Sequence, residues 1–142
     1  MIDLSSDQHP VDRHRTAISR AQLSKPLQIA ARHGFLDGSK SIFDYGCGRG
    51  NDVAILKVAG LNAAGWDPYY QPAADLIESD IINLGYVLNV IEDSGERVDT
   101  LIEAFSLAKV CLVVAVLTPH SLKTSNAQQF HDGVISSRNT FQ

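Results

Sequence analysis

The most informative segment of this chain is Phe43-Asp44-Tyr45-Gly46-Cys47-Gly48-Arg49-Gly50-Asn51-Asp52. It follows a short apolar run, carries glycine at alternate positions, and leads into a stretch with helical spacing. Glycine lets the backbone turn tightly, and the N-terminus of a following helix presents free N–H groups to a ligand. The segment therefore predicts a strand, a ligand-binding turn and a helix, in that order.

The regions around this turn predict alternating strands and helices. Strands are expected at 41–45, 63–67, 81–90 and 110–117, and helices at 51–59, capped by Asn51 or Asp52, and after the capping-box sequence that begins at Asp93. An interrupted apolar stripe between residues 16 and 33, broken at Pro26, predicts two short helices, the second capped by Ser24. The uniformly apolar run 110–117 indicates a strand buried on both faces. The alternation predicts an α/β fold with a parallel sheet.

Three regions follow from this reading. Residues 1–40 are expected to form a lead with short helices, residues 41–117 the ligand-binding core, and residues 118–142 a polar C-terminal loop. Only 12 residues separate Asp67 from Asp80, so a short link is expected where a further strand and its helices would otherwise lie. An apolar strand near a sheet edge favours association. We therefore expect a fragment of a longer protein or, less favoured, a partner covering that edge.

The acid before the glycines favours a cationic ligand. A carboxylate at Asp44, two residues before Gly46, would repel a pyrophosphate and attract the ammonium of a methionine moiety. Dinucleotide sites favour G-x-G-x-x-G, whereas the third glycine here, Gly50, comes one residue early. Asp67 ends the second expected strand, where a carboxylate can accept hydrogen bonds from both ribose hydroxyls. The pattern predicts S-adenosylmethionine as cofactor and disfavours a dinucleotide-dependent oxidoreductase.

Several segments together resemble one family. The turn resembles the first motif of class I methyltransferases, and with Gly65-Trp66-Asp67-Pro68-Tyr69 and the run 83–93 it is similar to the DNA phosphorothioation-associated methyltransferases. The run 14–20, Ser24-Lys25-Pro26 and the run 138–142 extend this resemblance over roughly residues 11–142. It implies a Rossmann-like methyltransferase sheet, from which this chain departs by the short link after Asp67 and by the C-terminal strands that it lacks, so the expected sheet is abbreviated. It also implies binding of S-adenosylmethionine and a role in DNA modification. The predicted cofactor residues are Asp44, Tyr45, Gly46, Cys47, Gly48, Gly50, Asp67, Pro68, Leu84 and Gly85.

Catalytic candidates are few, because methyl transfer depends mainly on proximity and orientation. Asn83-Leu84-Gly85-Tyr86 stands where amino-methylating DNA enzymes carry Asn or Asp, two prolines and an aromatic residue, so Tyr86 is a candidate to stack on an extruded base. Both prolines are absent here, and we favour the alternative in which Gly85 lets the chain pass the cofactor and Tyr86 packs in the cleft. Asn89 could orient a substrate or simply cap a turn, and we favour the turn. Tyr69 and Tyr70 could stack on the adenine of the cofactor or be surface residues. Cys47 is interpreted as a small filler and not as a nucleophile.

Charge and composition limit the partners. The net charge is −4, but residues 1–40 carry six Lys and Arg against four Asp. Arg13, Arg15 and Arg20 could contact DNA phosphates or form a solvated helix face, and the small charge excess slightly favours the solvated face. The five histidines and two cysteines lack metal-ligand spacing, and the longest apolar run is eight residues, so we expect no metal and no membrane span. We expect a cytoplasmic protein and, as an alternative to an enzyme, an inactive or truncated cofactor-binding module that associates with other DNA-modification proteins.

Overall fold

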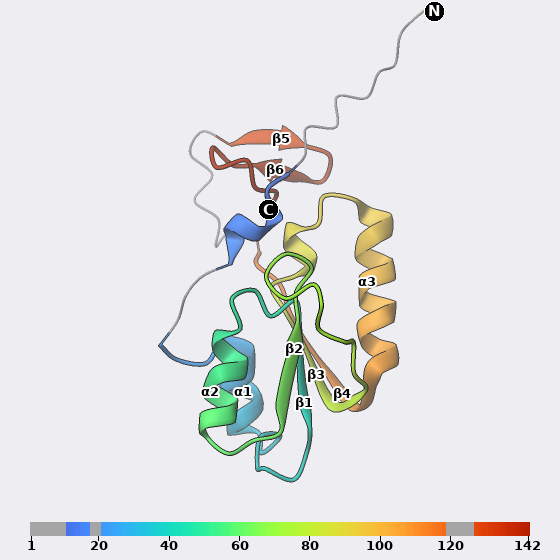
Figure 1. The fold of residues 1–142 in the computed structure, drawn as a ribbon. Coiled ribbons are helices and arrows are strands. Elements are labelled where there is room, and N and C mark those ends of the chain that lie inside the picture. The colour runs from blue at the N-terminus through green and yellow to red at the C-terminus, as the bar shows by residue number, and fades with distance from the viewer. Residues whose placement is uncertain (1–10, 18–20, 119–126) are drawn as a thin grey trace, which may run out of the picture.

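The computed structural model describes residues 11–17, 21–118 and 127–142, and its main body is a four-stranded parallel sheet. The strands are β1 (Ile42–Tyr45), β2 (Ala63–Trp66), β3 (Ser79–Gly85) and β4 (Ala108–Ala115). Helices α1 (Lys25–Arg32) and α2 (Asn51–Val58) cover one face, and α3 (Ser94–Leu107) covers the other (Figure 1). The predicted α/β class with a parallel sheet is confirmed, and the arrangement is compatible with a Rossmann-like fold.

The strand order fixes where a ligand can bind. The order is β2-β1-β3-β4, so β1 lies between β2 and β3. The chain passes from β1 to β2 on one side of β1 and then crosses to β3 on its other side. In open parallel sheets of this kind, ligands bind at the carboxyl ends of the strands, where the order reverses. In the pairing of β1 with β3, Asp44 lies opposite Asn83. The carboxyl ends of β1 and β3 therefore lie side by side where the strand order reverses.

The core consists of two apolar clusters, one on each face of the sheet. Successive strand residues point to opposite faces, so Ile42 packs toward α1 and α2 while Phe43 packs toward α3. The first cluster is formed by Leu27, Ile42, Val53, Leu56, Ala63 and Ile81. The second is formed by Phe43, Tyr45, Ile82, Leu84 and Ala104. Asp44 points to the same face of the sheet as Ile42. Its carboxylate therefore lies at the end of the first cluster nearest the carboxyl ends of the strands.

Of the two short helices predicted between residues 16 and 33, the second forms, for a different reason than expected, whereas the described residues between Thr16 and Lys25 are not helical. A short 3-10 helix, η1, covers Arg13–Thr16, and α1 begins after Ser24. Pro26 lies in the first turn of α1, where a missing N–H costs nothing, so it starts the helix and does not break one. Ser24 occupies the N-cap position without a side-chain capping bond. Of the predicted lead, residues 1–10 and 18–20 lie outside the described residues.

The remaining helices confirm the predicted positions with one changed cap. Asp93 caps α3, because its carboxylate accepts a hydrogen bond from the Glu96 N–H at 2.7 Å. The N-cap of α2 is Gly50 and not Asn51 or Asp52, since the turn brings Gly50 into the left-handed region at φ +77°. No helix within the described ranges combines the length and the apolar character that a membrane span requires.

Two strand predictions need correction. β3 starts at Ser79 and ends at Gly85, where the predicted strand ran on to residue 90; a 3-10 helix, η2 (Leu88–Val90), takes its place. β4 is not buried on both faces, because it is the edge strand and α3 covers only part of it: Val110 is 56% and Val114 is 44% exposed. The link between β2 and β3 contains no strand, as expected.

Of the polar C-terminal loop predicted at 118–142, residues 119–126 lie outside the described residues, and residues 127–142 are not a simple loop. Strands β5 (Gln128–Phe130) and β6 (Gly133–Ile135) form an antiparallel hairpin, and Phe141 is only 3% exposed against it. The Asp132 carboxylate accepts from Arg97 of α3 at 2.7 and 2.8 Å, which ties the hairpin to the main body (Figure 1). Strands of three residues with polar outward side chains show no usable alternation, so the pattern missed them.

Candidate functional site: a cavity at the carboxyl ends of the strands

A cavity of about 830 Å³ lies where the strand order reverses. The glycine turn, the N-terminal segment 11–17 and one side of α3 border it. Its size is that of a typical small-molecule site. Eight of the ten predicted cofactor residues line the cavity: Asp44, Tyr45, Gly46, Cys47, Gly48, Asp67, Pro68 and Gly85.

Three predicted site residues lie elsewhere. Gly50 forms the N-cap of α2, and Leu84 is fully buried in the core on the α3 side. Asn89 lies in η2, where its side chain accepts from the Leu117 N–H at 3.4 Å, so it borders a different groove and takes a local structural role. Tyr86 does line the cavity, with its backbone held at φ +62°. A non-glycine residue in that region is strained, a feature that often accompanies a functional site.

The glycine turn is packed closely against other parts of the chain. Gly46 has φ +79°, and a Cβ there would lie 2.5 Å from Cγ2 of Val87. Gly48 has φ +54°, and a Cβ there would lie 3.1 Å from Cβ of Ala17. Both positions thus require glycine for the backbone conformation and for the close approach of a neighbouring segment. These glycines shape the cavity by bringing its borders together.

Asp67 joins the end of β2 to the glycine turn. Its carboxylate accepts three backbone hydrogen bonds, from Gly48, Tyr69 and Tyr70, each at 2.9 Å. A carboxylate offers about four acceptor positions, so these bonds leave about one for a ligand hydroxyl. Asp67 therefore stabilises the glycine turn and is also a candidate ligand-binding group.

The pair Asp44 and Asn83 forms the floor of the cavity. These residues are 5% and 2% exposed, and the Asn83 Nδ2 amide donates to Oδ1 of Asp44 at 2.8 Å. An ionised carboxylate can only accept, so this bond fixes the orientation of the Asn83 amide. Its carbonyl oxygen, Oδ1, is then buried without a hydrogen-bond donor among the described residues. A buried acceptor of this kind is costly unless a ligand supplies the donor.

Ser24 and Asp52 extend this polar floor below the start of α1. The Ser24 N–H donates to Asp52 Oδ1 at 2.8 Å, and the Ser24 hydroxyl is buried with no partner among the described residues. Both side chains belong to residues less than 10% exposed that line the cavity. Neither residue was predicted to belong to the site, because only the fold places Ser24 and Asp52 in the same cavity as Asp44.

The N-terminal segment covers the cavity and is held by ionic and aromatic contacts. The Arg13 guanidinium donates to both oxygens of Glu92 at 2.9 Å and to the two oxygens of Glu96 at 2.6 and 2.7 Å. Beside it, the His14 ring stacks on Tyr69 with centroids 3.8 Å apart, and Tyr70 donates to the His14 carbonyl at 3.1 Å. Tyr69 lines the cavity and Tyr70 does not.

The candidate DNA contacts of this segment find little support in its geometry. The charge of Arg13 is offset by two carboxylates, and Arg15 lies 3.4 Å from Asp12. Arg20 lies outside the described residues. Sequence counting could not identify these ion pairs, because the partners of Arg13 are 79 and 83 residues away.

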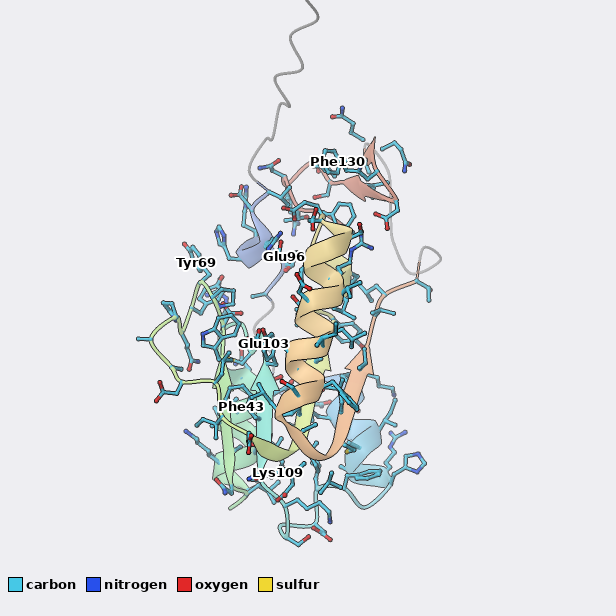
Figure 2. All side chains as sticks on the ribbon, turned by 90° about the vertical axis from the view of Figure 1, so that its right-hand side faces the viewer. Phe43, Tyr69, Glu96, Glu103, Lys109 and Phe130 are labelled. Carbon is cyan, nitrogen blue, oxygen red and sulfur yellow. The ribbon has the colours of Figure 1, made fainter. Side chains whose placement is uncertain are left out.

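One side of α3 adds further negative charge. Glu96, Asp99 and Glu103 line the cavity, and Figure 2 shows Glu96 and Glu103 on the side of α3 that faces Tyr69. The Tyr45 hydroxyl donates to Glu103, and burial, strengthened by that carboxylate, raises the pKa of Tyr45 above its ordinary value. More carboxylates than guanidinium groups line the cavity. One of those guanidinium groups, that of Arg13, is already paired with Glu92 and Glu96. The site therefore suits a cationic ligand better than a polyphosphate.

Cys47 is held as a neutral thiol. Burial, followed by the negative charges of Asp44 and Asp67, raises the pKa of its thiol to about 12. A thiol that stays protonated is a poor nucleophile. This agrees with the interpretation of Cys47 as a filler next to the turn.

The sequence matches no protein-family model, no curated protein and no solved structure. The family resemblance and what it implies therefore stay predictions. Within the described ranges, no group of three or more His, Cys, Asp or Glu side chains is arranged to hold a metal ion.

Proposed function

We propose that this chain binds S-adenosylmethionine in the cavity above Asp44 and transfers its methyl group to an acceptor. The observation that carries the proposal is the buried Asp44–Asn83 pair, in which a carboxylate and an amide oxygen without a donor lie together at the cavity floor. An ammonium carries several N–H donors and a positive charge, so it fits both groups. A pyrophosphate would meet a buried carboxylate there and be repelled.

The residues around the floor divide the remaining tasks. The cofactor supplies an activated methyl group when it is bound. The free acceptor position of Asp67 suits a ribose hydroxyl, and the glycine turn leaves the cofactor room beside β1. The segment 11–17 excludes water from above, since Arg13 holds it to Glu92 and Glu96. Tyr86 lines the cavity at the end of β3 and is our candidate for contact with the acceptor.

DNA as the acceptor rests on the family resemblance alone. The paired state of Arg13 does not favour phosphate binding by the N-terminal segment. Transfer of a radiolabelled methyl group to double-stranded and single-stranded DNA, with protein and small amines as parallel acceptors, would decide this point. Cofactor binding without transfer to any acceptor would favour the alternative of a non-enzymatic binding module.

A competition titration tests the cofactor class. S-adenosylmethionine and NAD are titrated into the protein by calorimetry, each alone and then in the presence of the other. The proposal expects heat from S-adenosylmethionine only, and no change in its affinity when NAD is present. Tighter binding of NAD would replace the proposal by a dinucleotide-binding function.

A further inference from the structure

The outward side of α3 carries an apolar stripe that nothing in the described chain covers. Val98 is 56%, Leu101 38%, Ile102 61% and Phe105 68% exposed. Their spacing of three, four and seven residues places them on one side of the helix. The cavity-lining residues Glu96, Asp99, Thr100 and Glu103 repeat that spacing two positions earlier and so lie on the opposite side. The stripe is therefore separate from the candidate site.

The stripe continues into a groove beside the edge strand. A shallow groove of about 340 Å³ lies between α3 and the end of β4, lined by Leu88, Asn89, Arg97, Val98, Leu101 and Val116. Val114, Val116 and Leu117 are 44%, 50% and 39% exposed next to it. A helix side and a strand edge that are both apolar form one continuous surface. Surfaces of this kind usually mark a binding interface.

The order of side chains in the stripe is complementary to itself. Val98 and Phe105 lie at equal distances from the midpoint between Leu101 and Ile102. In two antiparallel copies of α3 related by a two-fold axis at that midpoint, each Phe105 meets Val98 of the other copy. Leu101 likewise meets Ile102. A large ring then packs against the smallest side chain of the stripe at both ends, which is what an isologous interface requires.

The charges at the two ends of α3 match the same arrangement. Asp93 is the exposed N-cap, and Lys109 follows the C-terminus with its side chain 56% exposed and 4.0 Å from the exposed Glu78 of the same chain. An antiparallel partner brings Lys109 of one copy toward Asp93 of the other. It also aligns the two helix dipoles in opposite directions, which favours the pairing. A parallel pairing would instead place Asp93 beside Asp93 and Lys109 beside Lys109.

We propose that the protein forms a homodimer in which two copies of α3 pack antiparallel through Val98, Leu101, Ile102 and Phe105. The groove beside β4 receives the flank of the partner helix. Because the cavity lies on the other side of α3, both candidate sites stay open in the dimer. This inference is independent of the proposed function.

Sedimentation equilibrium of the full chain tests the dimer. The wild-type protein is expected to be dimeric at micromolar concentration, and Ile102→Glu and Phe105→Glu are expected to be monomeric. Val58→Glu is the matched control, because Val58 is 90% exposed on α2, away from the stripe, and this variant should remain dimeric. Circular dichroism confirms that each variant is folded. A monomeric wild type, or a dimeric Phe105→Glu protein, would overturn the proposal.

A size exchange tests the antiparallel register. Val98→Phe places two rings against each other and Phe105→Val leaves a gap, so each should weaken the dimer by about tenfold or more. The double variant Val98→Phe/Phe105→Val restores one large and one small side chain at each contact. It should recover most of the lost affinity. A double variant as weak as the sum of the single changes would contradict this register.

Discussion

The Asn83 amide donates to the Asp44 carboxylate at 2.8 Å across the adjoining ends of β1 and β3, and its own carbonyl oxygen is left without a donor. This bond holds the buried carboxylate of Asp44 in place at the floor of the cavity. Asn83→Ala removes it and leaves Asp44 with one hydrogen bond fewer, which typically costs about 1–3 kcal/mol. We expect a lower melting temperature and an affinity for S-adenosylmethionine reduced about tenfold or more. Unchanged affinity in a folded Asn83→Ala protein would remove Asn83 from the site.

A comparison of two glycines with the same φ angle distinguishes the cost of backbone strain from the cost of steric crowding. Gly34 and Gly46 both have φ +79°, but a Cβ at Gly34 meets nothing within 4 Å, whereas at Gly46 it lies 2.5 Å from Val87. Gly34→Ala should cost only the left-handed strain, about 1–2 kcal/mol. Gly46→Ala should cost about 1–3 kcal/mol more in urea denaturation. Adding Val87→Ala to Gly46→Ala should recover part of that difference, and equal costs at both glycines would contradict the crowding.

The ion pair of Arg13 with Glu92 should make stability depend on pH in the acid range. Burial opposes ionisation of Glu92, but the hydrogen bonds and charge of Arg13 prevail and hold its pKa below the ordinary value. The folded-state pKa is therefore below the unfolded one, so the stabilisation is present above the unfolded pKa and is lost as the pH falls through the folded one. At pH 7, Glu92→Gln should cost about 1 kcal/mol.

The pH profile of that variant provides the check. The difference in unfolding free energy between wild type and Glu92→Gln should shrink as the pH drops below about 4. Glu78→Gln is the control, since Glu78 is 69% exposed and lies 4.0 Å from Lys109, so it should show little difference at any pH. A difference that stays constant from neutral to acid pH would mean that Arg13 does not lower the pKa of Glu92.

The Cys47 thiol should react slowly. Because burial and two carboxylates raise its pKa to about 12, alkylation by iodoacetamide in a Cys111→Ser protein should stay slow through pH 9. An ordinary thiol is half ionised near pH 8.5. Denatured protein provides the reference rate. If the alkylation rate of the folded protein reached half its maximum near pH 8.5, Cys47 would be exposed and ionisable.

Local signals predicted the parts of the fold that depend on neighbouring residues. The alternate glycines after β1 indicated strand, turn and helix, and the sequence from Asp93 to Glu96 indicated a capped helix. Each of these features is decided within about ten residues, so the chain itself carries the information. Most of the residues predicted to bind the cofactor do line the cavity, because they belong to the turn or to a strand end.

Features that depend on distant partners could not be predicted in this way. Asn83 meets Asp44 only through the parallel register of β1 and β3, 39 residues apart. The apolar run of β4 resembled a buried strand, yet its position at the sheet edge leaves Val110 and Val114 exposed. Arg13 resembled a DNA contact by charge alone, but the fold pairs it with Glu92.

Binding of two ligands to the Asp44→Asn protein shows whether the Asp44 carboxylate recognises the ammonium of S-adenosylmethionine. Calorimetry compares S-adenosylmethionine with 5′-methylthioadenosine, which lacks the ammonium, in the wild type, in Asp44→Asn and in Asp75→Asn, an exposed carboxamide control. We expect Asp44→Asn to lose about tenfold or more in affinity for S-adenosylmethionine. Its affinity for 5′-methylthioadenosine, and both affinities of the Asp75→Asn control, should match those of the wild type. Equal affinity of Asp44→Asn and wild type for S-adenosylmethionine would contradict it.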